Sequence, residues 1–100
     1  MNSTLLPVDF DFVGGVPLWE RDVHHKHIRR EFVFKDFEQA FRFMTLSAQY
    51  AQELDHHPDW SNSWNRVTVC LTTHSAGGLT GLDIQMAQAM DQFAEQIHPQ

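Results

Sequence analysis

The sequence contains little cysteine, little positive charge and no long apolar run, and each shortage excludes a class of protein. Its single cysteine, Cys70, cannot form a disulfide within the chain. Seven Lys and Arg stand against thirteen Asp and Glu, and the formal charge of -6 repels phosphate backbones and anionic membrane surfaces. No stretch approaches the roughly 18 apolar residues that a membrane span needs. We therefore expect neither nucleic acid nor a membrane as a partner.

The N-terminus lacks the pattern of an export signal, because residues 1–15 contain no Lys or Arg ahead of an apolar run. This predicts a cytoplasmic protein. With 100 residues, 42% of them hydrophobic, the chain is long enough for one domain and too short for two. Folding hides about 65% of the surface of a chain of this size, so the core is thin and we expect a homo-oligomer.

The order of the expected elements predicts an α+β fold. Residues 1–17 show no regular period and are expected to form an arm or loop, followed by a single domain over residues 18–100. Alternating apolar residues predict a β-hairpin around residues 24–27, and a second pair of strands is expected at 59–60 and 66–73, with a turn at 61–63. With two helices, these strands predict a mainly antiparallel four-stranded sheet with the helices packed on one face.

Both helices have recognisable ends. Asp36 is expected to cap a helix that runs to Leu54, with Gln39 at the capping-box position, and Pro58 cannot continue that helix. Its apolar face is expected to contain Phe37, Phe41, Met44, Ala48 and Ala51. Thr80 is expected to cap the second helix, which Pro99 ends. In the strand over residues 66–73, period two turns Val67, Val69 and Leu71 inward, and Thr68, Cys70, Thr72 and His74 to the opposite face.

Three histidines and one aspartate, His56, His57, His74 and Asp83, stand where these elements begin or end. Imidazole has an unperturbed pKa near 6.5, so a cluster of histidines can divide acid and base roles at neutral pH. Each residue also has an ordinary structural role open to it. Histidines are favoured at a helix C-terminus, and Asp83 is the expected capping-box partner of the second helix. Nearby, Trp60 and Trp64 are either walls for a planar ligand or core residues.

The spacing of these residues matches a specific pattern. After His56, His57 and Pro58 come an aromatic residue six positions later, a histidine ten beyond it and an aspartate nine further on, at Trp64, His74 and Asp83. In this respect the stretch from Asp55 to Ile84 resembles the pterin-4a-carbinolamine dehydratases, and the resemblance extends over Trp19 to Phe93. Two features depart from the family. Gln52 stands where the family usually has Glu, and Pro and Gly residues occupy the N-terminal segment where the family usually has a helix.

The resemblance implies a lyase that dehydrates 4a-hydroxytetrahydropterin to quinonoid dihydropterin, recycling the pterin of an aromatic amino acid hydroxylase acting upstream. It implies no metal or organic cofactor, and assembly as a homodimer or homotetramer. It also implies that His56 and His74 act as acid and base, in an order left open, while His57 orients the substrate. Asp83 is then expected to fix a histidine tautomer or to contact the pterin. The remaining expected substrate-binding positions are Gln52, Pro58, Trp60 and Trp64.

Two alternatives remain open at the level of sequence. Gln52 hydrogen-bonds but cannot carry negative charge, so it is also compatible with a non-catalytic protein of the same fold that binds a pterin or another protein. The second alternative makes the histidines metal ligands. The two candidate sets are His56, His57 and His74, or separately His24, His25 and His27. Neither an HExxH nor a CxxC pattern supports it.

Overall fold

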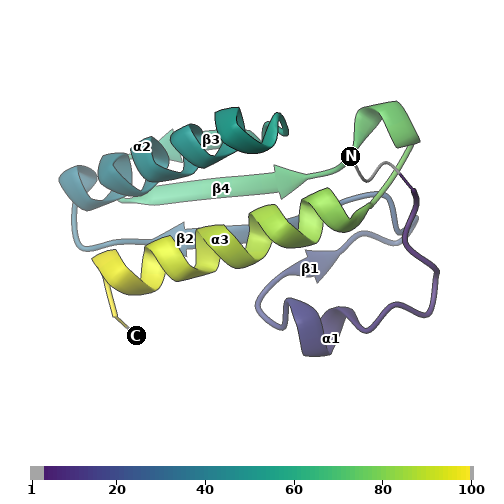
Figure 1. Cartoon of the computed structure of the whole chain (residues 1–100). Helices are drawn as coiled ribbons and strands as arrows, with labels where there is room; N and C mark the ends of the chain where they lie inside the picture. The colour runs from purple at the N-terminus through teal and green to yellow at the C-terminus, as the bar shows by residue number, and fades with distance from the viewer. Residues whose placement is uncertain (1–3, 100) are drawn as a thin grey trace.

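Two β-hairpins and two long helices make up most of the fold (Figure 1). It is seen in a computed structural model that describes residues 4–99, so the first three residues of the expected N-terminal arm lie outside the described part. The strands are β1 (Glu20–Arg21), β2 (Ile28–Val33), β3 (Asp59–Ser63) and β4 (Arg66–Leu71). They form one antiparallel sheet in the order β1-β2-β4-β3, which confirms the predicted α+β class.

The helices are α1 (Phe12–Gly15), α2 (Phe37–Leu54) and α3 (Gly81–Ile97), with a 3-10 turn η1 at His74–Ala76. Figure 1 shows α2 and α3 side by side over one face of the sheet. Val67, Val69 and Leu71 of β4 point into the core between these layers and are fully buried, as predicted. None of the helices in residues 4–99 is long and apolar enough to cross a membrane.

Helix α2 begins after the predicted cap Asp36 but buries a different face, and the Gln39 side chain accepts the backbone N–H of Lys35 and not that of Asp36. The Asp36 carboxylate accepts the backbone N–H of Gln39 at 2.9 Å, which caps the helix. Its buried residues are Ala40, Phe43, Ser47 and Ala51. The predicted face was therefore wrong in part, because Phe37 and Phe41 are 46% and 56% exposed. These two phenylalanines lie at ring-centroid distance 5.7 Å and form an apolar strip on the outside of the helix.

The hairpin of β3 and β4 differs from the prediction. Residues 61–63, expected as a turn, continue β3 to Ser63, and the reversal occurs at Trp64 and Asn65. The Asn62 amide donates to the carbonyls of Trp64 and Arg66 and holds the two strand ends together. The period-two pattern of a strand continued through these polar residues, but it was hidden because Ser and Asn are typical turn residues. Strand β4 ends at Leu71, two residues earlier than predicted.

The segment expected as an arm or loop is attached to the domain. It contains the single helical turn α1, and Val16 is fully buried in the core. The backbone N–H of Leu6 donates to the carbonyl of Leu79 at 2.9 Å, beside a bridge between Leu5 and Thr80. Residues 5 and 6 therefore lie against the segment that leads into α3, while Gly15 accepts a hydrogen bond from Gln88 in the middle of that helix.

Candidate active site

His56 is positioned by the way in which α2 ends. Asp55 adopts a left-handed conformation with φ 53°, and its backbone N–H returns to carbonyls of the last helical turn. The N–H of His56 donates to the carbonyl of Ala51 at 3.0 Å. This reversal of the chain places His56 between the end of α2 and the start of α3, where it is 8% exposed. Its side chain thereby faces the start of α3.

Asp83 is the fully buried partner of His56. It occupies the third position of α3, and one oxygen accepts the backbone N–H of the N-cap residue Thr80 at 2.9 Å. The same oxygen accepts the hydroxyl of Thr73 at 2.8 Å. The second oxygen lies 2.6 Å from His56 Nε2. The predicted capping box is confirmed, and the capping carboxylate also holds the histidine.

The proton positions in this network follow from the number of donors. A hydroxyl has one proton, and that of Thr73 is donated to Asp83, so the 2.8 Å contact between the hydroxyls of Thr73 and Thr80 requires Thr80 to donate. The N–H of Leu82 donates to the Thr80 hydroxyl in turn. Because a carboxylate only accepts, His56 donates through Nε2 and keeps Nδ1 as its remaining nitrogen.

His57 faces the opposite way from His56. Its Nε2 lies 2.6 Å from the Oε1 atom of Gln52, one turn earlier on α2, and both side chains are exposed. The amide oxygen accepts, so His57 Nε2 carries a proton and Nδ1 is left over. Gln52 thus fills the position of the family's acidic residue as a neutral hydrogen-bond acceptor.

His74 begins η1, beyond the end of β4, so it does not continue the strand face on which it was expected, and its side chain is exposed. Its Nε2 lies 3.5 Å from Oδ2 of Asp59, the first residue of β3. Both side chains are well exposed, so the contact is a weak surface ion pair when the histidine is protonated. The residue before it, Thr73, belongs to the buried network around Asp83.

The ends of α2 and β4 and the starts of β3 and α3 lie at one end of the molecule (Figure 1). This arrangement gathers His56, His57, His74 and Asp83 there, with Pro58 between the second histidine and β3. The two tryptophans are placed differently from these residues. Trp60 is half-buried and lines an apolar hollow with Phe41, Met44, Thr45 and Ala48 of α2. Trp64 is 63% exposed in the turn at the other end of β3, away from the histidines of its own chain.

Sequence reasoning missed two residues of this arrangement. Thr73 is buried and donates to Asp83. The sequence does indicate its inward position, because Thr73 continues the period of two set by Val67, Val69 and Leu71. A polar residue at an inward position needs a hydrogen-bond partner. Asp59 gave no comparable signal, since its approach to His74 depends on the pairing of β3 with β4.

The metal-site alternative finds no support in the arrangement of side chains. Within residues 4–99, no three His, Cys, Asp or Glu side chains converge in the way that an ion would require. Among the loop histidines, His24, His25 and His27 follow Asp22, whose carboxylate accepts three backbone N–H groups of the loop instead.

The fold and these contacts define an α+β protein with a histidine-based candidate acid–base site at one end of its sheet. Comparison with known proteins narrows the class to one family. The family model for pterin 4 alpha carbinolamine dehydratase matches residues 11–93, and the chain belongs to this family.

Individual relatives cover nearly the whole chain. Two bacterial proteins named "putative pterin-4-alpha-carbinolamine dehydratase" are similar to it. The one from Rhizorhabdus wittichii is 51% identical over 85% of this chain and 88% of its own. The one from Bordetella avium is 43% identical over 96% of this chain and 90% of its own. The crystal structure of a transcriptional coactivator/pterin dehydratase from Brucella melitensis superposes with a TM-score of 0.83 at 42% identity, covering 91% of this chain and 99% of that one.

Proposed function

We propose that this protein dehydrates 4a-hydroxytetrahydropterin to quinonoid dihydropterin and water, and thereby recycles the pterin used by an aromatic amino acid hydroxylase in the cytoplasm. The observation that carries the proposal is the buried His56–Asp83 pair, which lies beside His57 and His74 in a chain of the dehydratase family. The pair supports acid–base chemistry because a carboxylate that accepts from one imidazole nitrogen fixes the ring and leaves the other nitrogen unprotonated.

The reaction needs two proton transfers. One proton goes to the 4a-hydroxyl, which departs as water with the electrons of the C4a–O bond. The second leaves N5, and the N5–H electrons form the C4a=N5 double bond, so atoms and charge balance. Positioned imidazoles suit both transfers near neutral pH, and each transfer contributes about 10²- to 10⁴-fold in rate. No further redox or group-transfer step is required.

The roles of the histidines follow from their surroundings. His56 is the proposed base, because Asp83 holds its Nε2–H and stabilises the imidazolium that forms when Nδ1 takes the N5 proton. His74 is the proposed acid, because its exposure lets solvent return a proton after each turnover. His57 is proposed to orient the pterin, with Gln52 fixing its ring. Pro58 and Trp60 are the proposed neighbouring wall, and Trp64 would have to be supplied by another copy of the chain.

The test is the rate of dehydration of 4a-hydroxytetrahydropterin, generated in situ by phenylalanine hydroxylase and followed by ultraviolet absorbance. We expect clear acceleration by the unaltered protein, and its loss by about 10²- to 10⁴-fold in His56→Ala and in His74→Ala. The matched control is His24→Ala, which removes an exposed loop histidine and should leave the rate unchanged. Full activity in both site variants would refute the assignment.

The second candidate is a non-catalytic pterin-binding or protein-interaction member of the same fold, and the neutral Gln52 beside His57 favours it. The substitution Gln52→Glu separates the two candidates. In an enzyme, the new carboxylate favours protonated His57 and shifts the pH profile of an already substantial rate. In a protein whose site is inactive for lack of the acid, the same substitution should create a rate where the unaltered chain has none.

We also infer that copies of the chain associate as dimers or tetramers. The exposed strip of Phe37 and Phe41 on α2 supports this, because stacked apolar side chains on a thin-cored domain gain from being covered. Sedimentation at micromolar concentration should show an oligomer, and Phe41→Ser should weaken it. The surface variant Arg42→Ser, one position along, serves as the control, and a monomeric unaltered chain would contradict the inference.

A further inference from the structure

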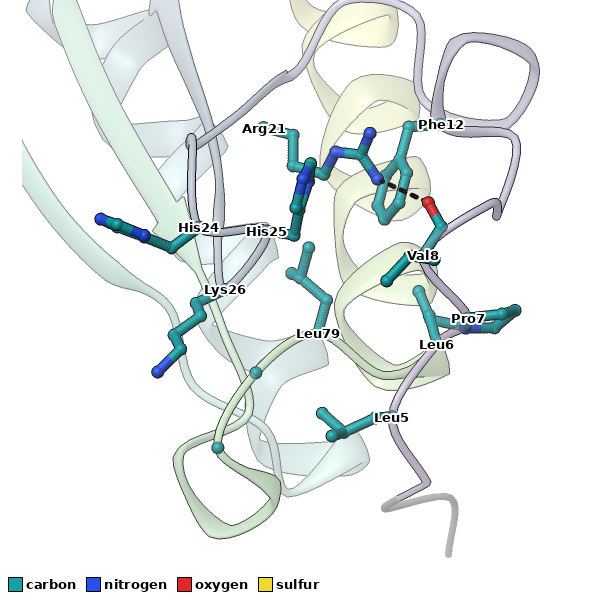
Figure 2. A pocket seen from close by; sticks show the side chains of 12 residues that line it. Leu5, Leu6, Pro7, Val8, Phe12, Arg21, His24, His25, Lys26 and Leu79 are labelled. Carbon is teal, nitrogen blue, oxygen red and sulfur yellow. Dashed lines mark hydrogen bonds between the residues drawn. The ribbon is translucent and has the colours of Figure 1, made fainter.

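A second hollow lies on the other side of the loop that joins η1 to α3. Figure 2 shows it between the N-terminal segment, the β1–β2 loop and the glycine pair that precedes Leu79. Its volume is about 220 Å³, which suits a small molecule rather than a cofactor of pterin size with a long side chain. It contains none of the proposed catalytic residues.

One side of the hollow is aliphatic, and the β1–β2 loop supplies polar residues on the other. Leu5, Leu6 and Val8 come from the N-terminal segment, and Leu79 faces them from the loop before α3 (Figure 2). Gly78 permits this close arrangement, since a Cβ added there would lie 3.1 Å from the Leu5 side chain. The hollow is therefore lined by residues from three segments that are far apart in the sequence.

Arg21 supplies positive charge at the hollow. Its guanidinium lies 4.4 Å from the centre of the Phe12 ring, and its hydrogen bond to the carbonyl of Val8 is long, at 3.5 Å. Figure 2 shows that Arg21 and His25 face the hollow, whereas His24 and Lys26 point away from it.

No carboxylate of the described segments neutralises this arginine through an ion pair. The adjacent Asp22 is occupied, because both its oxygens accept backbone N–H groups of residues 24–27. Asp11 likewise accepts the N–H of Gly14. The N–H donors of Arg21 that do not reach the Val8 carbonyl are therefore available to an anion from solution.

We propose that this hollow binds a small monocarboxylate with a branched aliphatic body. The carboxylate pairs with Arg21, and the body packs among Leu6, Val8 and Leu79. Phosphate alone would leave the aliphatic walls uncovered, and a neutral apolar molecule would leave the guanidinium unused. The anion that satisfies both parts of the hollow is an amphipathic one.

The experiment titrates 4-methylpentanoate into the ¹⁵N-labelled full chain and follows the backbone amides by NMR. Its neutral analogue 4-methylpentanamide has the same shape and serves as the ligand control. We expect saturable shifts at Leu6, Gly78 and Leu79, and binding of the amide at least about tenfold weaker, the effect of losing one charge-assisted contact. Equal binding of acid and amide, or shifts confined to other residues, would overturn the proposal.

Two variants test the arginine directly. Arg21→Gln should weaken binding of the carboxylate at least about tenfold, and Arg42→Gln, an exposed arginine on α2, should leave it unchanged. Equal weakening by both variants would show nonspecific attraction and refute the site. If Arg21→Gln loosens the N-terminal segment, the comparison of acid and amide on the unaltered chain decides alone.

Discussion

His56 and Asp83 meet at 2.6 Å across the ends of two different helices, and the same carboxylate caps the helix to which it belongs. One oxygen holds the histidine, while the other accepts from Thr73 and from the backbone of Thr80. The orientation of the proposed base is therefore coupled to the start of α3. Asp83, which the sequence explains as a helix cap, thus uses one oxygen for the cap and the other to hold His56.

The substitution Asp83→Asn should weaken both the N-terminal cap of α3 and the orientation of His56. The amide keeps the volume but replaces one acceptor oxygen by an NH2 donor, so His56 either loses the partner of its Nε2–H or takes the other tautomer, in which Nδ1 carries the proton and cannot act as the base. We expect a loss of about 2–3 kcal/mol in the free energy of unfolding. Urea denaturation measures this loss, and the dehydration assay should show a fall comparable to that of His56→Ala.

The matched control for Asp83→Asn is Asp36→Ala, which removes the cap of α2 and touches no proposed site residue. It should cost about 1 kcal/mol of stability and leave the rate of the folded protein unchanged. If Asp83→Asn lowers stability but keeps the full rate, Asp83 acts as a cap only, and the proposed support of His56 is wrong.

Much of the fold could be predicted from local patterns. Capping residues, proline positions and period-two strands located α2, α3 and β4 because each signal lies within a few adjacent residues. The face of α2 could not be found in this way. Phe37 and Phe41 are as apolar as Phe43, and only the packing of α2 against α3 and β4 selects which of them is buried.

For the candidate site, too, the local pattern identified the residues but not their tertiary contacts. Spacing in the sequence singled out His56, His57, His74 and Asp83, but not their pairings. That His56 takes Asp83 depends on the left-handed Asp55, which reverses the chain, and a left-handed Asp is not predictable from composition. The separation of Trp64 from the histidines likewise depends on β3 continuing through residues 61–63.

The β1–β2 loop should respond to acid through Asp22. Backbone hydrogen bonds, above all from His27, lower the pKa of this carboxyl to about 2. Since the folded pKa lies below the unfolded value, the stabilising contribution is complete above the unfolded pKa and is lost as pH falls through about 2. An NMR titration should show the amides of His24 and Lys26 moving with that midpoint. A midpoint at the ordinary Asp value would contradict this account, and Asp22→Asn should abolish the transition.

Replacing Ser47 by alanine should stabilise the protein. Its hydroxyl is fully buried on the core face of α2 and has no hydrogen-bond partner within residues 4–99. Ser47→Ala removes an unsatisfied polar group and adds helix propensity, so we expect a gain of about 1 kcal/mol in the free energy of unfolding. Urea denaturation tests this, with Thr45→Ala as the control, because that exposed hydroxyl does bond to the carbonyl of Phe41. A loss of stability in Ser47→Ala alone would contradict the prediction.

Trp64 stands in the turn between β3 and β4 with φ 50°, a conformation that costs an ordinary side chain about 1 kcal/mol and costs glycine little. Trp64→Gly should therefore raise stability relative to Trp64→Ala, since both remove the indole but only glycine relieves the backbone. Urea denaturation of the two variants gives this difference directly, and equal stabilities would show that the turn is unstrained.

The dehydration rates of the same two variants test whether Trp64 takes part in the reaction. Because the indole lies at the far end of β3 from the histidines of its own chain, a rate lost equally in both variants, with the oligomer intact, would mean that Trp64 reaches the site of a neighbouring copy.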